Sequence, residues 1–519
     1  MTKPFRRGAL ALPATMMTLT GTAWADVTPQ DVWAQWTAYM ASFGYELEND
    51  PIVDGANLRL PDFSMAMPVP ADPSTGKEGG IVRFRMGDIA LIDQGDGTVS
   101  VEVPASTPIS IIGESVGAEN FVVRGTMTSA GYRTVASGQP GDILYDFNAG
   151  SITFTLDDLT EADGQTKTPG EFELSLQGAA GQSRMNTLGG PTQMDQTLTL
   201  ARVTYAFDIP EIDGADTGHL KAEGELMGVT TTTTGTIPAT FDPAAVPQAL
   251  SEGYAMKADM GYTTGRSSFD FAEDGKAMRF ASTSEGGTFT VGMAAAGLVY
   301  EIAARGIDFS LEGSDIPFPI ATTLAGFDLG VDLPVLKGDA PQDFTARLKL
   351  TDLTVPEPLW MMIDAAGALP HDPLTAEIET SGKARLFVDV FDEDATAALV
   401  ENGRKPGEVT TLNLDSLLLK AGGATIAATG AFDVDNNAQS AFNPKMPAFA
   451  GQVDLRLTGV TTLISTLSQM GLIPAPQAMM ASGMIQQLGK PETGPDDVSA
   501  LIEVSKESRI TINGAPLPF

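Results

Sequence analysis

The best match to a catalytic motif in this sequence is the run from Gly113 to Gly117, which has the G-x-S-x-G spacing of a nucleophile elbow around Ser115. An elbow presents its serine between a strand and a helix, where a histidine can accept the hydroxyl proton. Residues 109–112 predict the strand, but a second strand, not a helix, is predicted from Phe121. His219 and His371 are the only imidazoles. A serine hydrolase at Ser115 is therefore the least favoured interpretation.

A second candidate group lies in the proline-rich segment 353–374. Pro358 predicts the start of a short helix that buries Trp360 and Ile363, and Gly367 predicts its end. The preferred interpretation is a rigid corner between strands, and the alternative is a loop that binds a ligand or a protein partner. The candidate residues of such a loop are Trp360, Asp364, His371 and Asp372.

No motif for a cofactor or a metal stands out. Two His and no Cys make a zinc or iron site improbable. There is no phosphate-binding loop and no dinucleotide-binding glycine motif ahead of a helix. Carboxylates are so frequent in this chain that no pair is singled out for acid–base work. We therefore predict a protein that is not an enzyme and holds no cofactor.

Two apolar helices are predicted near the C-terminus, over residues 461–470 and 476–488. The second carries Met479, Met480, Met484 and Ile485. Core packing is the preferred interpretation of these side chains. The alternative is an adaptable surface for lipid or a partner, which methionine makes well. If the sheet forms a groove, we expect this helix pair at its end or as its lid.

The composition is strongly acidic. The chain has 66 Asp and Glu against 31 Lys and Arg, a net charge of −35. Such a surface repels phosphate backbones and anionic lipid headgroups. Nucleic acid is thus excluded as a partner, and so is electrostatic docking to an anionic membrane.

The first 25 residues resemble a cleavable signal peptide. Lys3, Arg6 and Arg7 precede a short apolar run at 8–19, and Ala23 and Ala25 fit the small-residue cleavage pattern. The apolar run is shorter than the roughly 20 residues that span a bilayer. We expect cleavage after residue 25, export to the periplasm, and no transmembrane segment in the mature chain.

The mature chain predicts a mainly β protein. Period-2 alternation recurs along it, as at Leu412, Leu414 and Leu418, and it is typical of half-buried antiparallel strands. We predict long antiparallel sheets in a sandwich- or groove-like arrangement with a few short amphipathic helices. One helix is expected after the capping residue Thr28. A proline-rich stretch near 238 suggests an N-terminal region, 26–237, and a C-terminal region, 238–519, that holds the helix pair 461–488.

Several motifs resemble an uncharacterised Gram-negative exported family, known as domain of unknown function 2125. The motifs that carry the resemblance are Trp33 and Trp36 after the signal peptide, residues 353–356, Leu359-Trp360, Asp364, and residues 369–373. This chain departs from the family pattern at Ala365, where Pro is expected, and at His371, where a base such as Arg is usual. The resemblance implies the family over essentially the whole mature chain and no known chemistry.

A weaker similarity joins residues 409–472 to AsmA-like envelope proteins, which implies extended sheets with an apolar groove. From the alternating strands, the lack of a catalytic constellation and this similarity, we expect a non-enzymatic periplasmic protein that binds or carries lipid or another apolar ligand in a groove lined by the apolar strand faces. The main alternative is an envelope scaffold that works through protein contacts.

Overall fold

The computed structural model describes residues 26–69, 79–116, 119–160, 166–167, 170–209, 218–239, 241, 245–273, 275–441, 443 and 445–517. The predicted signal peptide lies outside these ranges. The described chain is mainly β, with 62% strand and 13% helix. Its strands form one 30-stranded sheet in which every pairing is antiparallel. The fold class predicted from the alternation is thereby confirmed.

The N-terminal strands are short. They are β1 (Glu46–Leu47), β2 (Ile52–Asp54), β3 (Asn57–Leu60), β4 (Ser64–Val69), β5 (Gly80–Met86), β6 (Ile89–Asp93), β7 (Val99–Glu102), β8 (Ser106–Val116), β9 (Glu119–Ala130) and β10 (Arg133–Gln139). The middle of the sheet is built from β11 (Asp142–Thr160), β12 (Thr166–Lys167), β13 (Glu171–Asn186), β14 (Thr192–Ile209), β15 (His219–Ile237), β16 (Ala255–Tyr262), β17 (Thr264–Glu273), β18 (Lys276–Ser284), β19 (Gly287–Ala294), β20 (Gly297–Gly313), β21 (Ile320–Leu333) and β22 (Gln342–Leu353).

The C-terminal end is built from β23 (Leu374–Leu386), β24 (Gly407–Ala421), β25 (Ala424–Gln439), β26 (Pro447–Thr458), β27 (Lys490–Gly494), β28 (Asp497–Val504), β29 (Ile510–Ile512) and β30 (Ala515–Pro516). The helices are α1 (Pro29–Ser42), α2 (Val246–Ser251), α3 (Glu357–Ile363), α4 (Glu393–Glu401), α5 (Val460–Gln469) and α6 (Ala475–Leu488). Both predicted C-terminal helices are present within one residue of their expected bounds.

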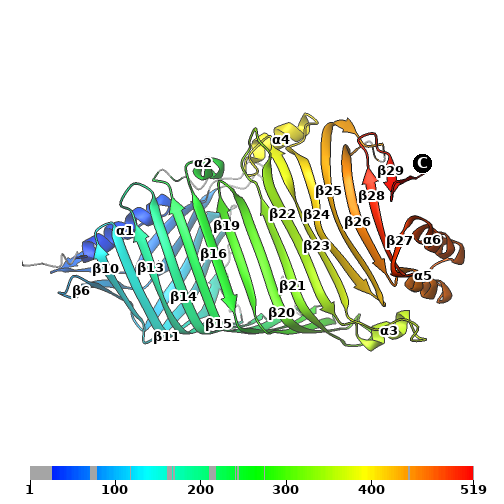
Figure 1. Ribbon diagram of the computed structural model, residues 1–519. Helices are drawn as coiled ribbons and strands as arrows, with labels where there is room; N and C mark the ends of the chain where they lie inside the picture. Colours follow the sequence, from blue (N-terminus) through cyan, green and yellow to red (C-terminus); the bar gives the residue numbers. More distant parts are fainter. Residues whose placement is uncertain are drawn as a thin grey trace, which may run out of the picture.

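Strands that follow each other in the sequence mostly lie side by side. From β20 to β26 each strand pairs with the next strand in the chain. The sheet therefore extends from the N-terminal end to the C-terminal end in chain order, as Figure 1 shows. The two regions expected on either side of residue 238 share this sheet, because β15 pairs with both β16 and β17.

Several long strands bend at residues that lie beside one another along a line that we call the crease. The bend is near the middle of β13, β15 and β20 and near the end of β22. Four of the bent residues have positive φ angles, between +52° and +60°: Gly178 on β13, Gly228 on β15, Gly306 on β20 and Asp352 on β22. Gly178 packs against Ala201 of β14, which leaves no room for a larger residue. Glycine suits such positions because it adopts positive φ without steric cost.

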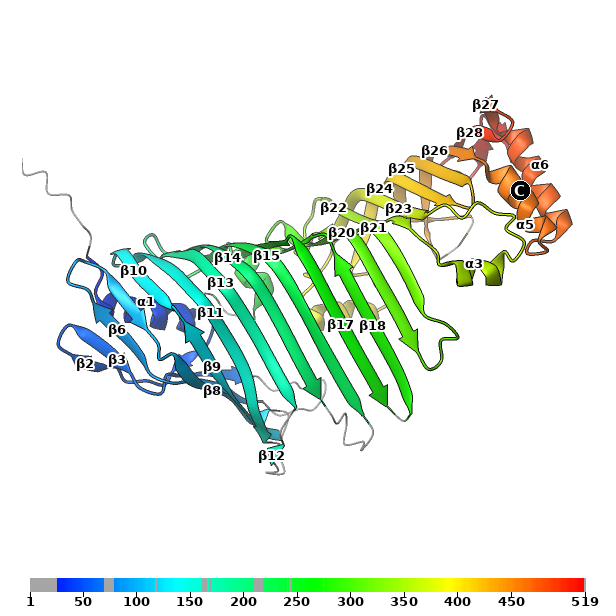
Figure 2. The same cartoon turned by 90° about the horizontal axis from the view of Figure 1, so that it is seen from below.

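The crease divides the sheet into an upper half, which includes β10, β16 and β19, and a lower half, which includes β9, β17 and β18. Figure 1 looks onto the upper half, and Figure 2, turned by 90°, looks onto the lower half. Side-chain alternation also shifts at the crease. On β11, Phe147 precedes Gly150 and Phe154 follows it, yet both pack in one cluster. The apolar side chains of the two halves therefore meet on the same side.

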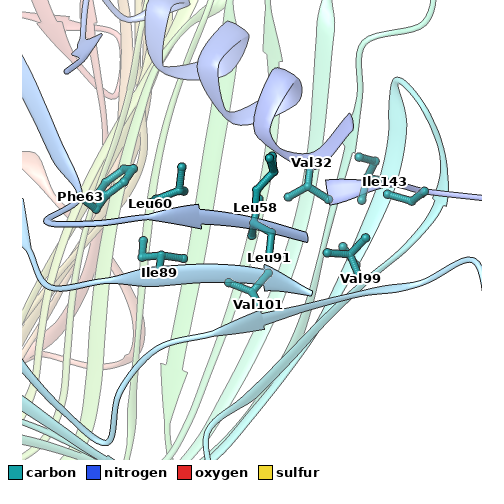
Figure 3. Close-up of a cluster of buried hydrophobic side chains, with 11 residues drawn as sticks. Val32, Leu58, Leu60, Phe63, Ile89, Leu91, Val99, Val101 and Ile143 are labelled. Carbon is teal, nitrogen blue, oxygen red and sulfur yellow. The ribbon is translucent and has the colours of Figure 1, made fainter. Parts of the chain in front are cut away.

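The N-terminal end is closed by α1. Thr28 caps this helix, and its hydroxyl accepts from the backbone N–H of Asp31 in the predicted capping box. At this end β11 pairs with β10 near its start and with β9 near its end, so the sheet forks into two branches. Val32 of α1 packs with apolar residues of β3, β6, β7 and β11, as Figure 3 shows. This cluster is the deepest core of the molecule, because Val32, Leu60 and Leu91 are fully buried.

Candidate functional site

One face of the sheet is apolar over almost its whole length, and we call it the apolar face. In the upper half, a cross-strand row of this face runs from β16 to β28 through the register of neighbouring strands. Its members are Met260, Phe289, Ile302, Leu329, Leu348, Ile378, Leu417, Ala428, Leu455 and Ala500. A row of the lower half runs from β14 to β21 in the same way: Phe207, Ala222, Phe269, Phe280, Leu311 and Ile320.

This apolar face is only partly covered. α1 lies on its N-terminal end, where Gln35 donates to the Met185 carbonyl at 3.1 Å and accepts from the Tyr145 hydroxyl at 2.8 Å. Farther along, large apolar side chains of the face stay more than a third exposed: Ile111, Phe172, Phe269, Met278, Tyr300, Leu333, Leu348, Ile378, Leu412 and Leu419. An apolar surface of this extent is unusual for a protein that works alone in water.

Aromatic rings lie flat over glycines of neighbouring strands on the apolar face. Tyr205 covers Gly224, Phe344 covers Gly382, and Phe432 covers Gly451. In each pair, a Cβ added to the glycine would lie within 2.8 Å of the ring. The glycines therefore let the rings lie against the backbone, which extends the apolar covering over positions that have no side chain.

The opposite face is polar and carries ion pairs. The guanidinium of Arg347 lies 2.6 Å from the Asp328 carboxylate and 3.0 Å from that of Glu301. Arg456 binds Asp497 through two nitrogens, at 3.0 and 2.9 Å. A shallow depression of about 810 Å³ lies over β14 to β21, and it is lined by residues of both faces, among them Tyr205 and Glu223. The segregation of charge to one face leaves the other for apolar contacts.

The segment between β22 and β23 brings together three of its four candidate residues. The Trp360 indole and the His371 imidazole are stacked, with centroids 4.4 Å apart and planes 2° from parallel. His371 Nδ1 lies 3.1 Å from a carboxylate oxygen of Glu357. Asp364 is buried beneath them, and His371 Nε2 lies 3.7 Å from its carboxylate. Asp372 is exposed and stands apart from this group.

The buried carboxylate of Asp364 organises the turn that follows α3. It accepts the backbone N–H of Leu369 at 2.6 Å and that of Ala368 at 2.9 Å. These bonds hold the pKa of Asp364 below its usual range. The helix expected from Pro358 forms and buries Trp360, but the expected burial of Ile363 is wrong, because that side chain is 54% exposed. Ile363 is the last residue of α3, and it is exposed together with Met361 and Met362.

Residues 263–517 match the profile of a bacterial family described as an uncharacterised protein conserved in bacteria, DUF2125. This part of the chain belongs to DUF2125. The matched range includes the Trp360–His371 segment, so the resemblance predicted from that segment is confirmed. The helix with Trp33 and Trp36 lies outside the matched range. No curated protein and no solved structure matches the chain, and the similarity to AsmA-like proteins stays a prediction.

The DUF2125 region also contains the methionine helix. Met479, Met480 and Met484 of α6 are exposed, so the preferred interpretation of core packing is wrong for them. Ile485 is half-buried, and Ala478 is the buried residue of α6. The helix pair stands at the C-terminal end of the sheet, which is one of the two places expected for it (Figures 1 and 2).

Outside the DUF2125 match, the elbow-like motif lies in a hairpin. Ser115 is on β8, and β9 begins at Glu119, so the strand is followed by a strand and the helix of an elbow is missing. Within the described residues, no three His, Cys, Asp or Glu side chains gather as they would around a metal ion. No helix of the described chain is long and apolar enough to cross a membrane.

An apolar groove was expected from the sequence, but the residues that form the apolar face were not identified. Alternating residues were apparent in each strand, but a single strand does not show what covers its apolar side. The glycines of the crease gave a usable signal, since Gly150, Gly178 and Gly228 interrupt alternating runs. Their alignment in neighbouring strands depends on register, which the sequence leaves open.

Proposed function

We propose that this protein is exported to the periplasm and binds the acyl chains of lipids along its apolar face, as a binding or carrier protein rather than an enzyme. The observation that carries the proposal is the long, partly exposed apolar face. A surface of this kind marks an interaction site, because leaving it in water is unfavourable at about 25 cal/mol per Å².

The dimensions of the face suit lipid chains. Twelve strands lie side by side from β14 to β28 by way of β16 and β19. At about 4.8 Å per strand they extend over roughly 50 Å. The hydrocarbon core of a whole bilayer is about 30 Å thick. The face therefore exceeds the length of one acyl chain and offers room for several in succession.

The chemistry of the face favours chains over headgroups. Its rows across β16 to β28 consist of aliphatic, aromatic and small residues, and the charged side chains Arg347 and Lys349 lie on the opposite face. A bound acyl chain needs no directional partner, and such rows provide none. We place the lipid headgroup at the rim of the sheet, beside polar connections such as the one between β21 and β22, where Lys337 and Asp339 are exposed.

The proposal is tested by native mass spectrometry and lipid extraction of the exported chain, purified without detergent. Leu412→Glu places a charge on the apolar face, at a side chain that is already 39% exposed. Ala431→Glu places the same charge on the polar face of the neighbouring strand, next to Asn413 and Gln452. We expect co-purifying phospholipid in the wild type and in Ala431→Glu, and its loss in Leu412→Glu.

Two outcomes would overturn the proposal. One is a wild-type protein that carries no lipid and acquires none from vesicles. The other is equal lipid content in Leu412→Glu and Ala431→Glu. If the wild type instead co-purifies with a stoichiometric protein that Leu412→Glu loses, the apolar face is a protein interface and the scaffolding alternative holds.

A further inference from the structure

The C-terminal end of the molecule carries a second exposed apolar surface, separate from the apolar face. It is formed by α3, α5 and α6 with the α5–α6 loop, and we call it the C-terminal tip. Both views place α3 beside α5 (Figures 1 and 2). Leu369, which follows α3, and Leu463 of α5 both pack over Gly422 in the β24–β25 turn. The tip is thus one packed unit.

The side chains that the tip exposes are large and apolar. Their exposed fractions are 66% for Met361, 71% for Met362, 54% for Ile363, 55% for Leu472, 70% for Met479, 64% for Met480 and 48% for Met484. On α6, Met480 and Met484 are four residues apart and share one side of the helix. Ala478, the buried residue of α6, lies on the other side, so α6 faces its methionines outward.

The charge distribution indicates what the tip contacts. Residues 457–489 contain no Lys, Arg, Asp, Glu or His, and this is the longest uncharged run in a chain with 19% charged residues. The acid nearest α5, Asp496, binds the N–H groups of Thr461 and Thr462 at 2.9 and 3.0 Å, so it caps the helix. The rim of a protein–protein interface is polar, whereas the side of a helix that enters the lipid interface is apolar, and α5 and α6 supply no charged rim around their exposed apolar side chains.

From these observations we propose that the C-terminal tip docks on a lipid bilayer, with the exposed methionines and Ile363 inserted among the headgroups and upper acyl chains. The tip has no Lys or Arg on α3, α5 or α6 to attract anionic headgroups. The rest of the chain is strongly acidic and is repelled by them. The tip should therefore prefer zwitterionic membranes, and anionic lipid should weaken its binding.

This inference goes beyond the proposed function, because docking of the tip does not require lipid on the apolar face. A bilayer held at this end would nevertheless place the C-terminal strands β26 and β28 next to a source of acyl chains. The two proposals fail separately: lipid content of the purified protein tests the apolar face, and vesicle binding tests the tip.

The experiment is flotation of the exported full chain with vesicles of phosphatidylcholine alone, and with vesicles that contain 30% phosphatidylglycerol. The tip variant is Met479→Gln with Met480→Gln and Met484→Gln, and an independent variant is Met361→Gln with Met362→Gln. The matched control is Ile52→Gln with Val53→Gln on β2, at the opposite end of the sheet, where both side chains are also more than half exposed. A rescue variant replaces the three α6 methionines with leucine.

We expect the wild type, the control and the leucine variant to float with phosphatidylcholine vesicles. Both glutamine tip variants should partition about tenfold less, since buried apolar area drives insertion. Phosphatidylglycerol should reduce wild-type binding at low salt, and the reduction should diminish as salt screens the repulsion. The inference is overturned if the wild type stays unbound, or if tip and control variants float equally. It is also overturned if the tip variants only dissociate a wild-type oligomer in vesicle-free solution.

Discussion

The hydroxyl oxygens of Tyr262 and Ser284 lie 3.1 Å apart, and the two residues come from opposite halves of the sheet. Tyr262 ends β16 in the upper half, and Ser284 ends β18 in the lower half. The ring of Tyr262 also packs over Gly265, next to Leu226. The bend at the crease is thus held by side-chain contacts on the apolar face as well as by the backbone.

Replacement of Gly178 by alanine should weaken the crease. Its φ is +60°, and the new Cβ would lie 2.8 Å from the Cβ of Ala201. Positive φ costs a non-glycine residue about 1–2 kcal/mol, and the contact with Ala201 adds to this. We expect Gly178→Ala to lower the free energy of unfolding by about 2 kcal/mol or more in urea titrations.

The control for that variant is Gly275→Ala in the β17–β18 turn. Its φ is also positive, at +76°, but no described atom lies within 4 Å of the added Cβ. Gly275→Ala should lower the free energy of unfolding only by the cost of the positive φ angle. Equal losses in the two variants would show that Ala201 exerts no steric pressure on Gly178.

The core beneath α1 should be the most sensitive apolar site of the chain. Leu91 is fully buried among residues of α1, β3 and β7. Leu91→Ala removes apolar contacts and leaves a cavity, which costs about 3 kcal/mol. Thermal denaturation followed by circular dichroism should show a clearly lower Tm, whereas Leu348→Ala on the partly exposed apolar face should change Tm much less. A smaller effect at Leu91 than at Leu348 would contradict the placement of the core.

Stacking on Trp360 should matter more than the identity of the residue at 371. The parallel rings of Trp360 and His371 are stacked, and such pairs contribute about 0.5–1.5 kcal/mol. His371→Ala should lose this contribution and speed limited proteolysis after α3. His371→Arg should retain most of it, because a guanidinium also stacks on an indole and can pair with Glu357. Equal cleavage rates for the two variants would argue against a stacking role.

The Arg456–Asp497 pair should make stability depend on pH in the acidic range. Hydrogen bonds from Arg456 and Thr493 hold the pKa of Asp497 well below its ordinary value. A lowered folded-state pKa gives stability that is complete above the unfolded-state pKa, near 4, and is lost as the pH falls through the lowered value. Arg456→Gln should therefore lower Tm at pH 7. The difference in Tm between this variant and the wild type should become smaller below about pH 4. A gap that stays constant from pH 7 to pH 2 would contradict this linkage.

Local structure could be predicted from the sequence wherever short-range patterns determine it. The capping box at Thr28 and Asp31 and the helix pair after Gly459 are examples. The alternation at Leu412 and Leu414 was interpreted correctly, but Leu418 lies on the polar face. The register shifts between Leu414 and Leu417, so Leu417 and Leu419 join the apolar face instead. A bulge of this kind is determined by pairing with the neighbouring strand and not by the local sequence.

The apolar face and the C-terminal tip were harder to predict, because their exposure depends on whether another layer of the structure covers them. Exposed Met479 and buried Ala478 are adjacent, and hydropathy alone would place both inside. Only the three-dimensional arrangement shows that the described chain has no second layer over α6 or over the C-terminal strands. In contrast, Asp364 could be singled out, since an aspartate directly after a short helix often accepts backbone N–H groups of the turn that follows.

The order of strands in the sheet has a consequence for how the molecule is made. From β20 to β26 every strand finds its partner in the segment synthesised just before it. Loop closure therefore stays short, and the growing edge is covered by the next hairpin to emerge. A chain that is delivered from its N-terminus can begin on the core beneath α1 and zip toward the C-terminus. In such a sequence of events the C-terminal tip forms last, when the surface that leads up to it is already complete.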